Sequence, residues 1–384
     1  MGNKLKDLKR KFLLHKSTQS FRFPTLTRPY FNAPILPTRF LEKQVILKNQ
    51  ILERICLAYQ QAEKTSGSED IWTELAAENS DFLSALRNND YARLRTFFQN
   101  MFHGRLTYGM AHTDIFLSKK TPYSPQYFTL RVRDSILALA EALSVKNLHS
   151  NQQTSFEDYM HSTNGNLELH IENIEKALGH SVCTPNVGRP PVASVGKYLI
   201  NPDSTRHAYV MFRVKQLGFN PEDPILEIGG GFGNVARYAF LQGFRNYTII
   251  DLPYVSAIQA AFLAATIGEE NISLFNETQE APIKIIPSIF KAYIKQKFSL
   301  TLNMDSLPEI NLEEAISYLN FVQNSSQYFL SINQEAKKTH KGSILQHSVP
   351  DMIEGLDNFK RLHRHPYWME QGYAEELYKV EKYK

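Results

Sequence analysis

A glycine-rich segment with an acidic residue at its start offers the clearest chemistry in this chain. Four glycines lie within Glu227-Ile-Gly-Gly-Gly-Phe-Gly233, between an apolar run and a stretch with helical spacing. Glycine readily takes positive φ angles and lets a ligand approach closer than a Cβ would allow. The helix that follows would present unpaired N–H groups at its first turn. Strand, turn and helix together predict a cofactor-binding site.

Two classes of cofactor fit such a turn. Gly231-x-Gly233-x-x-Ala236 matches the dinucleotide-binding fingerprint, and Asp251 follows about 20 residues later. A pyrophosphate, however, would lie beside the carboxylate of Glu227, where like charges repel. The same carboxylate attracts the ammonium and sulfonium groups of S-adenosylmethionine. The electrostatics therefore favour S-adenosylmethionine as the cofactor.

Asp251 ends a second apolar run, in Ile249-Ile-Asp-Leu-Pro253. A carboxylate at this position can accept hydrogen bonds from both hydroxyls of a ribose, which either cofactor would present. A purely structural interpretation is that the glycine turn serves packing and Asp251 forms a turn before Pro253. We favour cofactor binding because both acids accompany an intact turn. The expected cofactor-binding residues are Glu227, Gly229, Gly231, Gly233, Asp251 and Asn303.

Candidate catalytic groups follow a later apolar run, in Asn303-Met-Asp-Ser-Leu-Pro-Glu309. In an open α/β sheet, ligands bind at the carboxyl ends of the strands, where this loop would lie. A hydroxyl acceptor needs a group that removes its proton, and we expect Glu309 in this role, with Asp305 second. Alternatively, Glu309 stabilises the start of the helix near Asn311. His340 and His347 are rival bases.

Polar and aromatic residues near the end of the chain are candidates for substrate binding. Tyr367 and Trp368, beside Arg364 and His365, would offer aromatic faces that stack on a sugar ring. The expected substrate-binding residues are Ser306, Arg364 and Trp368; ordinary packing is the alternative for the aromatic pair. Upstream, Arg206, His207 and Tyr209 are candidates to cover the cofactor. We expect no metal, because histidines and carboxylates do not recur at a recognised ligand spacing.

These residues need a scaffold of alternating strands and helices. Residues 206–217 are expected to form a short helix. Beyond it, short β-branched runs at residues 225–228, 247–251, 298–303 and 328–333 alternate with helical stretches, which is typical of a parallel sheet. Residues 272–275 and 284–286 are alternatives for the third strand, and the adenine contact would be Asn276 or Glu277 in the first case and Ser288 in the second. Closing strands are expected at residues 344–347 and 375–380.

The first half of the chain has a different pattern. Apolar residues recur at helical spacing over residues 41–64, 82–102, 127–148 and 167–178, and Gly179 is the expected C-cap of the last helix. Three prolines and a glycine in Thr184–Pro191 interrupt regular structure. We therefore expect an α-helical domain over residues 1–183, for substrate cover or dimerisation, and a cofactor-binding domain over residues 184–384. The sequence does not choose between a monomer and a homodimer.

Composition and net charge argue against several kinds of partner and cellular location. The net charge of +4 over 384 residues is too small to predict a nucleic-acid partner. Cys56 and Cys183 are the only cysteines, which favours a reducing, cytoplasmic location over a disulfide framework. No apolar run approaches the ~20 residues of a membrane span, so we expect no integral membrane segment.

Several motifs resemble those of one family. Glu227-x-Gly-x-Gly-x-Gly233 followed by Ile250-Asp-Leu-Pro253 is similar to class I S-adenosylmethionine-dependent methyltransferases. Leu302–Ile310, Val187-Gly-Arg-Pro190 and His365–Tyr373 resemble segments of the bacterial sugar O-methyltransferases. The resemblance covers residues 187–384 and implies a Rossmann-like, seven-stranded methyltransferase sheet.

The same resemblance implies a function. We expect an O-methyltransferase whose substrate is a hydroxyl of a nucleotide-linked sugar or a glycan. Two alternatives stay open: a phenol, amine or carboxylate acceptor with the same cofactor, and a methyltransferase-like scaffold without catalysis.

Overall fold

The computed structural model describes residues 21–23, 34–42, 46–63, 78–111, 124–150, 152–335 and 347–381. Before residue 184, this part of the chain forms six helices and one short strand, as the helical spacing predicts. These elements are β1 (Thr38–Phe40), α3 (Asn49–Glu63), α5 (Ser80–Arg87), α6 (Tyr91–Gln99), α8 (Ser124–Ala142), α9 (Phe156–Asn164) and α10 (Leu167–Leu178). Helix α10 ends at Gly179, whose φ of 75° confirms the expected C-cap.

The expected helix over residues 82–102 is two helices, α5 and α6. Asn89 has a φ of 53°, a left-handed value that interrupts the helix. The side chain of Asp90 then accepts a hydrogen bond of 3.1 Å from the N–H of Arg93 and caps α6. Local capping thus divides a continuous apolar pattern into two shorter helices.

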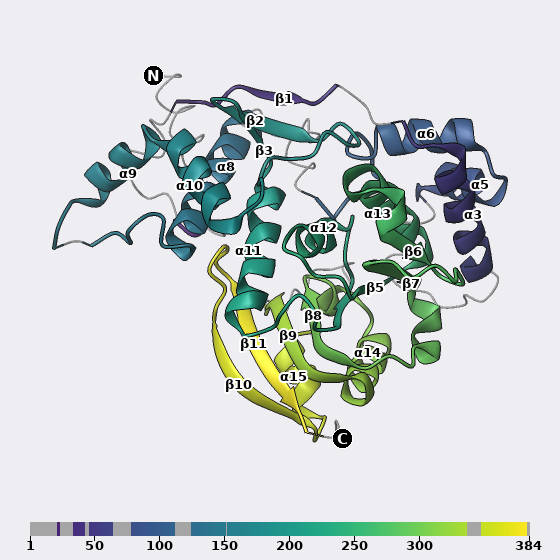
Figure 1. The fold of residues 1–384 in the computed structure, drawn as a ribbon. Coiled ribbons are helices and arrows are strands. Elements are labelled where there is room, and N and C mark those ends of the chain that lie inside the picture. The colour runs from purple at the N-terminus through teal and green to yellow at the C-terminus, as the bar shows by residue number, and fades with distance from the viewer. Residues whose placement is uncertain are drawn as a thin grey trace, which may run out of the picture.

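After residue 184, strands and helices alternate around one large sheet (Figure 1). Its order is β10-β11-β9-β8-β4-β5-β7-β6, and all pairs are parallel except β11 with β9 and β10 with β11. The chain is therefore a mixed α/β protein with a mainly parallel sheet, as expected. The strands are β2 (Pro191–Val195), β3 (Tyr198–Ile200), β4 (Ile225–Ile228), β5 (Tyr247–Asp251), β6 (Ile272–Leu274), β7 (Ile283–Pro287), β8 (Phe298–Met304), β9 (Ser326–Gln334), β10 (Phe359–Pro366) and β11 (Tyr373–Val380). The helices are α11 (Pro202–Gln216), α12 (Asn234–Leu241), α13 (Pro253–Ile267), α14 (Leu312–Ser325) and α15 (Val349–Glu354), with 3-10 turns η1 (Glu269–Asn271), η2 (Ser288–Tyr293) and η3 (Leu307–Glu309).

The sheet has eight strands among the described residues rather than the expected seven. Both candidates for the third strand form strands, because both apolar runs pair. β7 lies beside β5, with Pro287 opposite Asp251, and β6 adds to the outer edge of β7. β7 is therefore the strand that follows β5 across the sheet.

The closing strands differ from the expectation. Residues 375–380 lie in β11, as expected, whereas residues 344–346 lie outside the described residues. The strand that closes the sheet is β10, which was not expected. Its side chains are mostly polar and exposed, in keeping with an edge strand, so the segment carries little apolar alternation.

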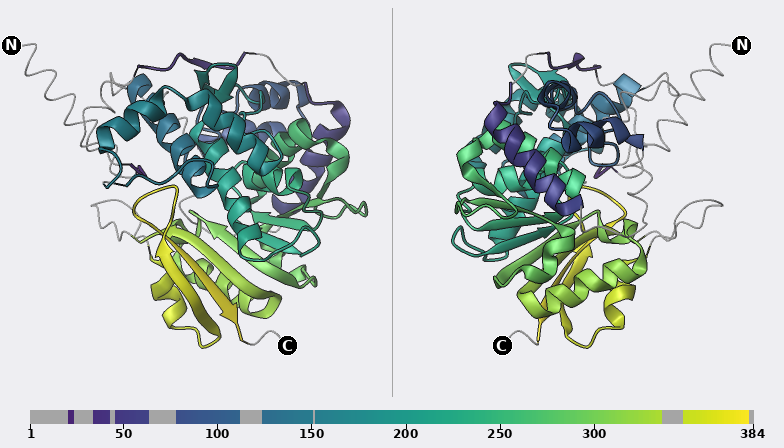
Figure 2. Two further views of the ribbon diagram at one scale, coloured as in Figure 1. Left: turned by 60° about the vertical axis from the view of Figure 1, so that its left-hand side comes forward. Right: turned by 90° about the vertical axis from the view of Figure 1, so that its right-hand side faces the viewer.

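The helices of the first half pack against the second half. α3 contacts α13, and α8 contacts α11. Figure 2 shows the purple and blue helices of the first half lying against the teal and green helices of the second half. One cluster of buried apolar residues extends through both halves. β1 pairs with β2, with Thr38 opposite Ala193, which ties the two halves together by backbone hydrogen bonds. The domain boundary after residue 183 stays a prediction. Within the described residues, no helix combines the length and apolarity that crossing a membrane requires.

The register of the central strands sets the position of the expected site. Ile228 of β4 lies opposite Ile250 of β5 on one side and Asn303 of β8 on the other. The three strands therefore end at one edge of the sheet. The glycine turn, Asp251 and the loop after Asn303 consequently open onto the same space.

Candidate active site

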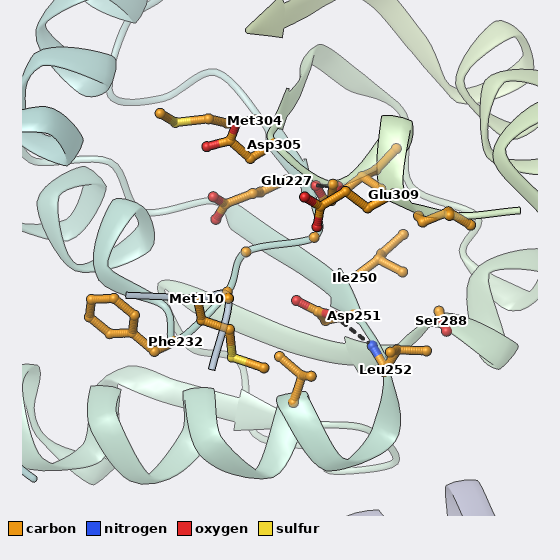
Figure 3. A pocket seen from close by; sticks show the side chains of 18 of the residues that line it. Met110, Glu227, Phe232, Ile250, Asp251, Leu252, Ser288, Met304, Asp305 and Glu309 are labelled. Carbon is orange, nitrogen blue, oxygen red and sulfur yellow. Dashed lines mark hydrogen bonds between the residues drawn. The ribbon is translucent and has the colours of Figure 1, made fainter. Parts of the chain in front are cut away.

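A cavity of about 720 Å³ lies at the carboxyl ends of β4, β5, β7 and β8. Figure 3 shows Glu227, Asp251, Asp305 and Glu309 around it. Gly229, Gly231 and Ser306 line it as well. Sequence positions separated by about 80 residues thus meet in one cavity, because parallel strands end side by side.

The glycines of the turn have different reasons to lack a side chain. Gly229, Gly231 and Gly233 have φ angles of 73°, 54° and 93°, which side chains disfavour. A Cβ on Gly229 would lie 2.2 Å from the Ser306 Oγ. A Cβ on Gly231 would meet no protein atom nearer than Met110, at 3.8 Å, and would project into the cavity. Gly229 is thus required by packing, whereas Gly231 leaves room for a ligand.

Glu227 is almost completely buried at the end of β4, with 2% of its surface exposed. Its carboxylate accepts a hydrogen bond of 3.0 Å from the hydroxyl of Tyr247. Burial raises the pKa of Glu227 to about 8, and the negative charge of Asp251 acts in the same direction.

Asp251 is buried at the end of β5. Its carboxylate accepts hydrogen bonds from the Leu252 N–H at 2.8 Å and from the Gln259 side chain at 2.7 Å. Burial raises its pKa to about 7, although these hydrogen bonds oppose the shift. Within the described residues, no cationic side chain pairs with Asp251 or Glu227. Two buried carboxylates without a cationic partner suit a positively charged ligand.

Asn303 holds the site together without lining the cavity. It is fully buried, and its amide nitrogen donates to the Ile228 carbonyl at 3.0 Å. Its Oδ1 accepts from the Asn333 side chain at 2.9 Å. Asn303 therefore ties β4, β8 and β9 together, and because it lies behind the cavity wall its contact with the cofactor stays a prediction. Ser306 does line the cavity, and its hydroxyl also donates to the Ile228 carbonyl at 3.2 Å.

The two candidate bases have different surroundings. Asp305, with a left-handed φ of 65°, forms an ion pair with the buried guanidinium of Arg206. One oxygen of the Asp305 carboxylate is therefore already paired with a cationic donor. Glu309 lies on η3 and lines the cavity. The helix-capping alternative for Glu309 is not supported, because the Asn311 side chain caps α14 by accepting from the Glu314 N–H at 2.9 Å.

The residues expected to form a sugar platform lie elsewhere. Arg364 pairs with Glu335 and Glu376, and the Trp368 indole N–H donates to the Ala138 carbonyl at 2.8 Å. Neither residue lines the cavity, which the nearby Tyr373 does. Trp368 instead packs against α8, because β10 ends before it and the chain turns back toward β11.

The remaining candidate residues also differ in whether they line the cavity. Ser288 lines the cavity after β7, whereas Asn276 and Glu277 follow β6 and do not; Ser288 is thus the better placed adenine contact. Arg206 and His207 line the cavity and Tyr209 does not. His347 does not line it, and His340 lies outside the described residues.

Residues from the first half of the chain also line the cavity, and the sequence did not predict them. Tyr59 and Glu63 of α3 and Arg87 of α5 line the cavity. The Tyr59 hydroxyl and the Arg87 Nε both donate to Glu63 Oε1, each at 2.7 Å. Tyr59 and Glu63 are four residues apart and so share a helix face, but Arg87 joins them only through packing of α5.

Comparisons with known proteins add little at this distance. No family model matches the chain, and no curated protein matches it. Among solved structures, magnesium protoporphyrin IX methyltransferase from Synechocystis PCC 6803, with S-adenosylmethionine bound to it, is similar at 12% identity and a TM-score of 0.33, over 46% of this chain and 78% of that one. The CcbJ methyltransferase from Streptomyces caelestis and the glycopeptide N-methyltransferase MtfA, complexed with S-adenosylhomocysteine, each match at 12% identity and a TM-score of 0.36, over 45% of this chain and 89% of theirs. Likeness this distant assigns neither a family nor an activity to the chain.

Proposed function

We propose that this chain is an S-adenosylmethionine-dependent methyltransferase that methylates a hydroxyl of a sugar, either nucleotide-linked or in a glycan. One observation carries the choice of cofactor: Glu227 and Asp251 are buried beside the glycine turn with only neutral hydrogen-bond partners. A dinucleotide would bring negative charge beside these two carboxyl groups, whereas a cationic ligand stabilises their ionised form.

The residues present fit this cofactor. Glu227 would attract the ammonium and sulfonium groups, Asp251 would accept from the ribose hydroxyls, and Gly231 would leave space for the ligand. Ser288, after β7, would lie near the adenine. When bound, S-adenosylmethionine supplies a methyl group that the positive sulfur activates. The protein therefore has mainly to align the acceptor and to exclude water.

On the acceptor side, Glu309 is the proposed base. Glu309 would take up the proton that the acceptor hydroxyl loses when its oxygen bonds to the methyl carbon, while the methyl–sulfur bond would break and S-adenosylhomocysteine would leave. Arg206 holds Asp305 in an ion pair, and we assign Asp305 to orient an acceptor hydroxyl by hydrogen bonding.

Calorimetric titration tests the cofactor assignment. The protein should bind S-adenosylmethionine and S-adenosylhomocysteine, and it should not bind nicotinamide dinucleotides tightly. Tight binding of a nicotinamide dinucleotide without binding of S-adenosylmethionine or S-adenosylhomocysteine would contradict the proposal. A screen of labelled methyl transfer to sugars, phenols, amines and carboxylates then identifies the acceptor, and binding without transfer to any acceptor would indicate a scaffold.

A further inference from the structure

Two histidines and a buried glutamate meet at the edge of the sheet, away from the cavity described above. His363 and His365 lie two residues apart on β10 and therefore share one face of the strand. Glu375 of β11 lies directly opposite His365 in the register. Glu375 and His365 also contact Arg213 of α11, which runs beside this hairpin (Figure 1).

The spacing of these groups matches that of metal ligands. The Nε2 atoms of His363 and His365 lie 3.3 Å and 3.4 Å from Glu375 Oε1. Ligand atoms at ~2.0–2.1 Å from a tetrahedral zinc ion lie roughly 3.3 Å apart, so these distances correspond to edges of such a tetrahedron. One ligand atom from each of the three residues falls within 4.8 Å of the others.

Polar atoms in the cluster lack partners. Glu375 is fully buried, and its Oε2 accepts no hydrogen bond from the described residues. The Nε2 of His363 is likewise buried, and although it lies 3.3 Å from Glu375 Oε1 it forms no hydrogen bond with the described residues. A buried carboxylate oxygen and a buried imidazole nitrogen without partners are costly unless something binds them.

The hydrogen bonds around His365 prepare it as a ligand. Its Nδ1 lies 3.1 Å from the Pro366 carbonyl, which can only accept, so Nδ1 carries the proton. Nε2 then carries a lone pair, to which the Arg213 Nη2 donates at 3.3 Å and which a metal ion could take instead. In a metal-binding histidine, one ring nitrogen usually binds the ion and the other donates a hydrogen bond to a carbonyl or carboxylate. The side chain is 40% exposed, which leaves a path for an ion.

Arg213 is the competing cation. Its Nε donates to Glu375 Oε1 at 2.7 Å, and its Nη2 lies 3.3 Å from the His365 Nε2. The oxygen that faces both histidines is Oε1, so an ion would replace Arg213 there, and Oε2, which has no hydrogen-bond partner among the described residues, is free to take the guanidinium. The positive charge of Arg213 weakens, but does not block, metal binding, because it is partly exposed and therefore screened by solvent.

We propose that His363, His365 and Glu375 bind a divalent transition-metal ion of the zinc class, with solvent as the fourth ligand. The ion would link β10 to β11, at a place outside the wall of the candidate active site.

The test uses the untagged full chain after treatment with a chelator. Zn²⁺ binding is measured by competition with a chromophoric chelator, and Co²⁺ is added in parallel for its visible spectrum. We expect one equivalent to bind and a four-coordinate Co²⁺ spectrum. His363→Ala and His365→Ala should each weaken binding at least about tenfold. His161→Ala, on the exposed face of α9, is the matched control and should change nothing.

Arg213→Gln gives an independent check that does not depend on removing a ligand. Loss of the competing cation should tighten Zn²⁺ binding, and Zn²⁺ should raise the melting temperature of this variant more than that of the unaltered chain. If Zn²⁺ binds neither protein, or binds both histidine variants as well as the unaltered chain, the cluster is an ion-pair network centred on Arg213 and the proposal is wrong. Affinity for S-adenosylmethionine is measured separately, so failure here leaves the proposed function untouched.

Discussion

Glu227 and Asp251 are buried at the glycine turn among neutral donors, whereas Asp305 and Glu370, in the wall of the same cavity, share the guanidinium of Arg206. The first pair has raised pKa values, near 8 and 7, because burial is not offset by a cation. Arg206, in contrast, supplies the positive charge for the second pair. The difference suggests that one side of the cavity is built to receive a cation and the other to hold its own charges in place.

The largest expected effect is at the glycine turn. Gly231→Val should abolish binding of S-adenosylmethionine, because the new side chain projects into the cavity from a backbone with a φ of 54°. Calorimetry measures the loss, and circular dichroism with thermal melting shows whether the fold survives. Unchanged affinity in a folded variant would mean that the turn only serves packing.

The second effect separates the two candidate bases. Glu309→Gln should slow single-turnover methyl transfer by ~10²–10⁴, since the amide cannot accept the hydroxyl proton. Asp305→Asn should slow it less, because Arg206 already holds that carboxylate. Cofactor affinity should barely change in Glu309→Gln. If neither variant slows the transfer step, the base lies elsewhere and His340 and His347 are tested next.

A smaller effect is expected at Asp251. Asp251→Ala should weaken S-adenosylmethionine binding by ~1–3 kcal/mol, the cost of losing charge-assisted hydrogen bonds. Titration calorimetry gives the difference directly. Asp223→Ala, at a carboxylate outside the cavity, serves as the control. Equal affinity in both variants would remove Asp251 from the cofactor site.

The raised pKa values predict a dependence on pH. Glu227 and Asp251 hold their protons longer in the folded protein than in the unfolded chain, so ligand-free stability is lost as pH rises from about 4 to about 8. A cationic ligand prefers the ionised carboxylates. The rise in melting temperature on adding S-adenosylmethionine should therefore grow between about pH 6 and about pH 8.5. Glu227→Gln should flatten this dependence; an equally steep one would exclude Glu227 as its source.

The smallest effect tests the start of α14. Asn311→Ala removes a side-chain cap and should lower stability by about 0.5–2 kcal/mol, with turnover close to normal. Chemical denaturation and single-turnover assays on the same variant measure both. A large loss of turnover would show that the loop geometry set by α14, and not Glu309 alone, limits the reaction.

Local sequence patterns were enough to predict much of the fold. Strands β4 and β5 and helix α10 have the bounds that the sequence predicts, because apolar runs, glycines and caps act over a few residues. The count of strands was wrong because two apolar runs were treated as alternatives and both pair. β10 was missed because an edge strand with polar side chains lacks an apolar signal.

The sequence by itself determined the glycine turn and the two acids that follow β4 and β5, since strand, turn and helix are consecutive in the chain. Only the tertiary structure decided that Arg206 pairs with Asp305, that Asn303 is buried, that α3 and α5 help to line the cavity, and that Arg364 and Trp368 lie away from it. The same holds for the meeting of Glu375 with His363 and His365. The physical reason is that these contacts join residues whose separation along the chain bears no relation to strand or helix periodicity, so only sheet register and helix packing bring them together.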